Sequence, residues 1–171
     1  MPRLTQPRQM SGACLGVDPG LNRTGYALIE RTARGPALRE AGVIRSTPGR
    51  SLAQRVCEIG SGLREVLAEH HPALMAVEQV FSFGRNPKTA LLLAHARGAI
   101  LMAAAELEIP VIHYTPTEVK RLLTGSGRAS KEQIQHAIRN ELGLADVLEP
   151  NDVADASAIA LCLYHSARRA A

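Results

Sequence analysis

Two acidic residues stand directly after short apolar runs, where a carboxylate could be held rigidly enough to do chemistry. Asp18 follows Ala13–Val17, and Glu78 follows Ala73–Val77. Runs of this length and composition are typical of buried β-strands. Ligands of open α/β sheets bind beyond the carboxyl ends of the strands. The sequence therefore predicts that both carboxylates lie at a functional edge of a sheet.

Two further acids have helical spacing near the C-terminus. Asp152 and Asp155 are three residues apart, so they lie on one face of the helix predicted to begin at Pro150. Ile159 and Leu163 continue that face and are apolar. We therefore expect the face to pack inward and to carry both carboxylates into the fold.

A cluster of four carboxylates is electrostatically unfavourable unless a cation neutralises it. Mg²⁺ prefers oxygen ligands, and two such ions about 3.5–4 Å apart can activate water and stabilise the leaving oxygen in phosphodiester cleavage. Each acid alone also has a structural interpretation. Asp152, for example, could simply complement the dipole of its helix. The four together favour a metal-dependent phosphodiesterase.

The elements that must position these residues follow from apolar periodicity and turn residues. Three strands come first, and the second and third of them suggest an antiparallel meander. Helices then alternate with strands before a helical end. This order predicts an α/β domain with a mixed sheet. The expected strands are 13–17, 24–31, 37–46, 73–77 and 111–114, and the expected helices are 51–70, 87–107, a short helix from 115, 130–142 and 150–168.

Length and composition are those of a single globular domain. The chain has 171 residues, of which 46% are hydrophobic. We expect a flexible tail over residues 1–12 and one nuclease domain over 13–168. The net charge of +4 and the pI of about 9.3 favour a polyanionic partner only weakly.

The cysteines and the apolar segments indicate a reducing, aqueous compartment. Three cysteines, Cys14, Cys57 and Cys162, are widely spaced among apolar residues and are predicted to be buried free thiols. The N-terminus lacks the apolar run of a signal peptide. The longest apolar segment, 89–107, is interrupted by charged residues. We therefore expect a cytoplasmic protein without a membrane partner.

The motifs around the four acids resemble those of the RuvC family of Holliday-junction resolvases, within the RNase H-like superfamily. Leu15–Gly20 with Thr24-Gly25-Tyr26 is similar to the first motif of the family, and Ala76–Phe81 to the second. Further matching segments are Ala94–Gly98, Gly127–Gln135 and Asn151–Ala156. The resemblance extends over about residues 13–166 in the same order.

This resemblance implies both a fold and an activity. It implies an RNase H-like fold with a mixed five-stranded sheet flanked by helices. Asp18, Glu78, Asp152 and Asp155 would be the catalytic, metal-binding tetrad, with two Mg²⁺ ions per site and Mn²⁺ as a substitute. The expected substrate is a four-way DNA junction, cut by paired symmetric nicks in recombination and DNA repair. The resemblance also implies a homodimer and a branch-migration complex of the RuvA–RuvB kind as partner.

Several residues are candidates for contact with DNA. Phe81 lies just past Glu78 on a polar, glycine-containing loop, where it could anchor the loop or stack on bases. The resemblance favours a role near the exchange point of the junction. Lys120 and Lys131 correspond to basic residues of the family near the scissile phosphate, although on sequence grounds alone they are ordinary helix lysines. Arg85, Lys88 and Arg128 could extend a phosphate-binding surface.

Three other functions are compatible with parts of this pattern. Asp18-Pro19-Gly20 is similar to the first phosphate loop of sugar kinases and actin-like ATPases, but those proteins duplicate the domain, and this chain has room for one copy. A catalytically different RNase H-like nucleic-acid protein is a second alternative. A non-catalytic junction-binding module is the third, and it would gain nothing from concentrating carboxylates against a polyanion. No histidine shows metal-ligand spacing.

Overall fold

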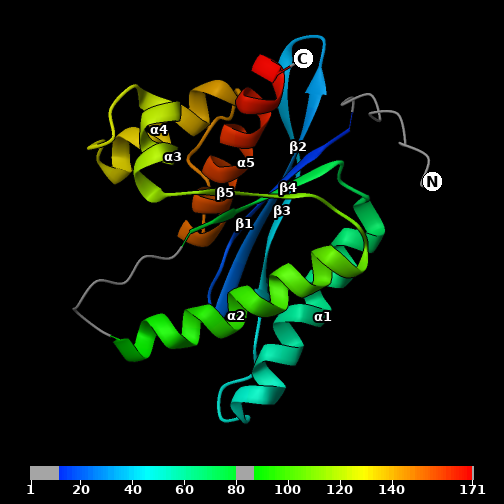
Figure 1. The fold of residues 1–171 in the computed structure, drawn as a ribbon. Coiled ribbons are helices and arrows are strands. Elements are labelled where there is room, and N and C mark those ends of the chain that lie inside the picture. The colour runs from blue at the N-terminus through cyan, green and yellow to red at the C-terminus, as the bar shows by residue number, and fades with distance from the viewer. Residues whose placement is uncertain (1–11, 80–86, 171) are drawn as a thin grey trace, which may run out of the picture.

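Five strands and five helices form the part of the chain that the computed structural model describes, residues 12–79 and 87–170 (Figure 1). The order matches the sequence-based expectation, with boundaries shifted by one or two residues in most elements. The elements are β1 (Cys14–Asp18), β2 (Arg23–Thr32), β3 (Gly35–Arg45), α1 (Leu52–His70), β4 (Leu74–Glu78), α2 (Pro87–Glu106), β5 (Val111–Tyr114), α3 (Pro116–Thr124), α4 (Lys131–Glu141) and α5 (Asn151–Ala170).

The strands make one mixed sheet in the order β3-β2-β1-β4-β5. β2 and β3 pair antiparallel as predicted, and β1 pairs antiparallel with β2. On the other side of β1, β4 and then β5 add in parallel. Parallel strands need crossover connections, which α1 and α2 provide. The α/β class with a mixed five-stranded sheet is therefore confirmed.

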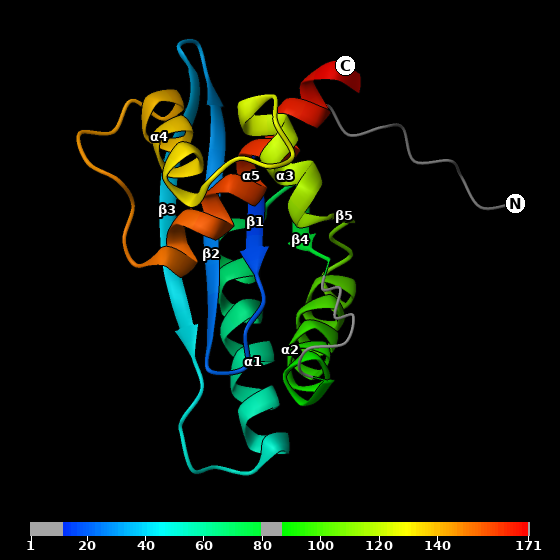
Figure 2. The same ribbon diagram turned by 90° about the vertical axis from the view of Figure 1, so that its left-hand side faces the viewer.

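Helices cover both faces of the sheet (Figures 1 and 2). α5 lies on one face, with α3 and α4 beside it, and α1 lies on the other face with α2 packed against it. Two apolar clusters fill the two interfaces. Ile159 and Leu163 of α5 belong to the first, and Leu63 and Leu67 of α1 to the second. The inward face predicted for the last helix is thus confirmed.

The helix starts are determined by local sequence. Ser51, Thr115 and Ser130 are the N-caps of α1, α3 and α4, and each forms a reciprocal capping box with the residue three positions later. Such a box satisfies two backbone N–H groups that the first turn leaves without partners. These short-range contacts explain why the three starts could be predicted closely.

One prediction about the cysteines was wrong. Cys14 and Cys162 are buried free thiols, but Cys57 is exposed. The buried side of α1 runs through Ile59, Leu63 and Leu67. Cys57 lies off that stripe, so its apolar neighbours in sequence did not indicate burial.

Candidate active site

Asp18 and Glu78 end two neighbouring strands at the same edge of the sheet. β1 and β4 are paired in parallel, with Val17 opposite Val77, so the next residue of each strand is an acid. Both acids are partly exposed, whereas the valines before them are fully buried. The rigid core beneath the two strands therefore determines the positions of both carboxylates.

The N-terminal end of α5 reaches this edge because two glycines allow it to lie directly on the sheet. A Cβ atom on Gly16 would come 2.2 Å from the carbonyl oxygen of Ala156, and one on Gly25 would come 2.1 Å from that of Asp152. Any side chain at these two positions would push the helix away. The close contact places Asp152, and Asp155 one turn later, beside Asp18.

Electrostatic effects at Asp18 show that the four acids form one cluster. Burial, together with the charges of Glu78, Asp155 and Asp152, raises the pKa of Asp18 to about 8. Lys131 acts in the opposite direction. Without a cation, Asp18 is therefore protonated over much of the neutral range.

The other two buried acids respond in the same way. Burial raises the pKa of Glu78, with a contribution from Asp155, and Lys120 lowers it. Burial also raises the pKa of Asp155, which Lys131 lowers. Two lysines are thus close enough to influence the carboxylates.

A pocket of about 290 Å³ brings these lysines and acids together. Its lining includes Glu78, Asp155, Lys120 and Lys131. The structure therefore places the two predicted lysines next to two members of the predicted tetrad.

The remaining predicted DNA-binding residues are not part of this pocket. Lys88, near the start of α2, and Arg128, before α4, are exposed to solvent. Phe81 and Arg85 lie outside the residues that the structure describes.

Sequence reasoning missed Arg23. This residue begins β2, and its Nη2 atom is 2.8 Å from Oδ2 of Asp152. The antiparallel return of β2 beside β1 brings it there, since Asp18 is paired with Gly25. The signal in the sequence was a basic residue at the start of the strand that follows the Asp18 turn.

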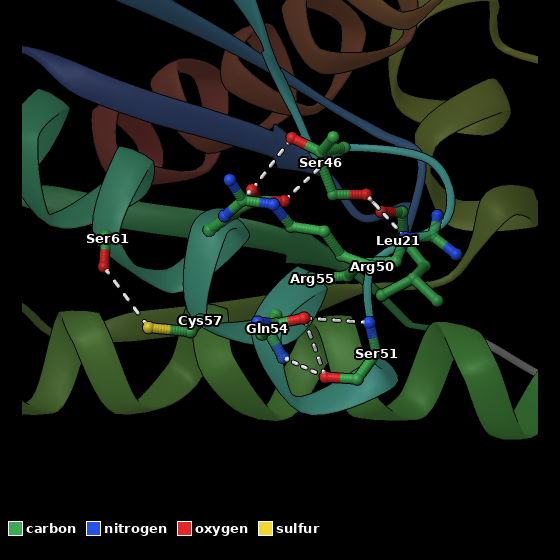
Figure 3. A network of polar contacts seen from close by, with 10 residues as sticks. Leu21, Ser46, Arg50, Ser51, Gln54, Arg55, Cys57 and Ser61 are labelled. Carbon is green, nitrogen blue, oxygen red and sulfur yellow. Dashed lines mark hydrogen bonds and ion pairs between the residues drawn. The ribbon is translucent and has the colours of Figure 1, made fainter.

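Hydrogen bonds hold the turn that joins Asp18 to β2. The buried hydroxyl of Thr24 donates to the carbonyl of Gly20 at 2.8 Å and accepts from its N–H. The Ser46 hydroxyl donates to the carbonyl of Leu21 at 2.6 Å, and Nε of Arg55 donates to the same hydroxyl (Figure 3). The turn after Asp18 is therefore attached to the end of β3 and the start of α1.

The chain is similar to known proteins over most of its length. The family model "Crossover junction endodeoxyribonuclease RuvC" matches residues 14–163. The chain belongs to the RuvC family. A RuvC of Rhodopirellula baltica is 53% identical over 161 residues, which cover 94% of this chain and 90% of that protein.

Solved structures of RuvC agree with this assignment. The structure of Thermus thermophilus RuvC has a TM-score of 0.86 and 35% identity, covering 92% of this chain and 96% of the other. The same protein in complex with a Holliday junction substrate has a TM-score of 0.85 and 34% identity, with the same coverage. The RNase H-like fold of the RuvC family is therefore the fold of this chain.

The donor set fits the metal dependence of the RuvC family. Asp18, Glu78, Asp152 and Asp155 offer only oxygen ligands, which Mg²⁺ prefers. The raised pKa values of Asp18, Glu78 and Asp155 reflect burial and mutual repulsion. A bound cation would remove this repulsion, so these residues suit a hard divalent ion.

Proposed function

We propose that this chain is a structure-selective endonuclease that resolves Holliday junctions by paired symmetric nicks in recombination and DNA repair. The observation that carries the proposal is the carboxylate cluster at the edge of the sheet, where three acids have raised pKa values and two lysines border them. Family membership supports the substrate, because T. thermophilus RuvC has been solved with a Holliday junction.

Asp18, Glu78, Asp152 and Asp155 would hold two Mg²⁺ ions, for which Mn²⁺ could substitute. The ions would activate a water molecule and stabilise the leaving oxygen of the cleaved phosphodiester. Asp18 and Glu78 would keep their positions during the reaction because each ends a buried strand. Such preorganised ligands need little rearrangement when substrate binds.

Lys120 and Lys131 would bind phosphate oxygens beside the carboxylates. Both line the pocket that contains Glu78 and Asp155, so they border the region where the phosphate would enter. Exposed Lys88 and Arg128 would extend the contact to the flanking backbone. Phe81 remains a candidate on the resemblance, and Arg85 remains one as a possible extension of the phosphate-binding surface.

We also propose a cytoplasmic homodimer that works with a RuvA–RuvB branch-migration complex. α2 exposes Leu91 and Met102, which are 62% and 52% exposed in the single chain. By length and composition α2 could cross a membrane, but core helices of soluble proteins can have the same length and composition. Burial against a second copy explains this apolar surface and gives the two active sites that paired nicking needs.

Cleavage of a synthetic four-way junction, beside a linear duplex of the same sequence, tests the proposed activity. With Mg²⁺, the wild-type protein should cut the junction and leave the duplex intact. Asp18→Asn should abolish cutting while junction binding persists, because phosphate contacts supply most of the affinity. Ca²⁺ should likewise permit binding without efficient cutting.

Two results would count against the proposal. Near wild-type cutting by Asp18→Asn would exclude the carboxylate site. Binding of the junction without any metal-dependent cleavage by the wild-type protein would favour the alternative of a non-catalytic junction-binding module.

A further inference from the structure

A second group of possible metal ligands meets on the α1 side of the sheet and shares no residue with the carboxylate cluster. Glu40 lies on β3, and Glu69 and His70 lie in the last turn of α1. One ligand atom from each residue lies within 4.8 Å of the other two. Residues far apart in sequence thus present two carboxylates and an imidazole to a common point.

The second observation that points to a ligand is the buried imidazole of His70. Its side chain is only 7% exposed, and Nε2 lies 2.9 Å from Oε2 of Glu40. The two groups form an ion pair that helps to lower the pKa of Glu40, yet Nε2 has no hydrogen bond of standard geometry to any residue that the structure describes. A buried polar atom without such a bond is unfavourable. A cation placed between the nitrogen and the carboxylates would satisfy it.

Glu40 is itself held in place by a neighbouring strand. The Tyr26 hydroxyl donates a hydrogen bond to the other carboxylate oxygen, Oε1, at 2.8 Å. This bond lowers the pKa of Glu40, so the side chain is a carboxylate at neutral pH. The Tyr26 ring lies against Gly42, where an added Cβ would be 2.7 Å from the hydroxyl oxygen. Metal-binding carboxylates commonly have such an outer hydrogen-bond partner.

The surroundings favour positive charge and admit an ion from solvent. The last turn of α1 carries the negative end of the helix dipole. Glu69 is exposed, and the Glu40 side chain is 38% exposed. A hydrated cation can therefore reach the three ligands.

We infer that Glu40, Glu69 and His70 bind a divalent transition-metal ion such as Zn²⁺. Imidazole nitrogen is a good ligand for Zn²⁺, whereas Mg²⁺ prefers oxygen, so this site differs in chemistry from the all-carboxylate cluster. Three protein ligands leave one position of a tetrahedral ion for water. The ion would tie the C-terminal end of α1 to β3 and so stabilise the packing of helix on sheet.

Zinc titration of the full chain tests this inference. The Asp18→Asn protein is stripped with chelator and titrated with Zn²⁺ in a calorimeter, with millimolar Mg²⁺ present to compete at the remaining carboxylates. We expect one saturable Zn²⁺ site per chain and a higher melting temperature with Zn²⁺. In the same background, His70→Gln should remove the site, and Glu69→Gln should weaken it by at least about tenfold.

Glu69→Gln should fold normally even if His70→Gln does not, because the Glu69 side chain is exposed. His71→Asn is the matched control, since His71 is also exposed, lies next in sequence and has the left-handed conformation (φ 45°) that asparagine tolerates. This variant should bind Zn²⁺ like its parent. The inference would be overturned if the parent protein showed no saturable binding at micromolar Zn²⁺. It would also be overturned if His70→Gln and Glu69→Gln bound Zn²⁺ as tightly as the parent. Either result would leave His70 and Glu40 as an ion pair only.

Discussion

Asp18 combines a buried position with three like-charged neighbours, and its protonation is therefore linked to both folding and metal binding. Its pKa of about 8 is far above the ordinary value of 3.8. Between these two values the folded, metal-free protein holds a proton that the unfolded chain has released. The free energy of unfolding must then fall as pH rises from about 4 to about 8.

We predict that Asp18→Asn reduces this pH dependence. In chelator, urea unfolding at about pH 5 and about pH 8 should show that the wild-type protein loses more stability on going to the higher pH than the variant does. Adding Mg²⁺ at about pH 8 should restore stability to the wild-type protein, because the ion neutralises the ionised cluster. An identical pH dependence in the two proteins would contradict the raised pKa of Asp18.

Arg23 competes with any cation for Asp152. Its guanidinium is 2.8 Å from the carboxylate, and the two side chains are 38% and 28% exposed. A partly exposed ion pair of this kind is worth up to about 1 kcal/mol. A metal that uses Asp152 as a ligand must overcome this contact.

Replacing Arg23 should therefore strengthen metal binding. We predict that Arg23→Gln binds Mn²⁺ roughly two- to fivefold more tightly than wild type in calorimetry without DNA. Arg64→Gln is the control, because Arg64 makes a similarly exposed ion pair with Glu106. Weaker Mn²⁺ binding by Arg23→Gln would mean that Arg23 orients Asp152 for the metal and does not compete with it.

At the scale of elements, the site depends on direct contact between α5 and the sheet. Gly16 on β1 and Gly25 on β2 have no side chains to separate the helix backbone from the strands. The contact sets the height of Asp152 and Asp155 above Asp18. A displacement of the helix would therefore alter the ligand geometry.

Gly25→Ala tests this dependence. The added methyl group would overlap the carbonyl of Asp152, so we expect a loss of about 1–3 kcal/mol in stability and a roughly hundredfold loss of junction cleavage at a temperature where the variant is folded. Gly62→Ala crowds Ile44 in the other core layer, at 2.6 Å. It should cost stability but retain cleavage, and equal cleavage by both variants would refute the positioning role.

At the scale of the whole molecule, α2 presents an apolar surface that the single chain leaves partly uncovered. Its buried residues include Ile100, Ala103 and Ala104, which face α1 and the sheet. Leu91 and Met102 lie exposed on the same helix. A helix that is apolar on more than one side is expected to be covered on more than one side.

We predict that the protein is a dimer at micromolar concentration and that Leu91→Glu with Met102→Glu makes it a monomer. Both side chains are exposed, so the double variant should fold. Sedimentation equilibrium measures the association, and a junction assay should show single nicks in place of paired nicks. A wild-type monomer that still makes symmetric paired nicks would rule out the proposed dimer.

Local sequence determined the features that depend on neighbours along the chain. Apolar runs ending at Asp18 and Glu78 marked the strand ends, and the spacing of Asp152, Asp155 and Ile159 marked one helix face. The starts of α1, α3 and α4 likewise depend on local capping contacts. These signals are readable because periodicity and capping act over only a few residues.

Tertiary structure alone decided which distant residues meet. The sheet order brings Arg23 to Asp152, and the packing of α1 on the sheet brings His70 to Glu40 while leaving Cys57 in solvent. None of these outcomes has a local signature, because each depends on how strands pair and which helix face is covered. The pKa of Asp18 belongs to the same class, since burial and charges from two other elements, β4 and α5, raise it.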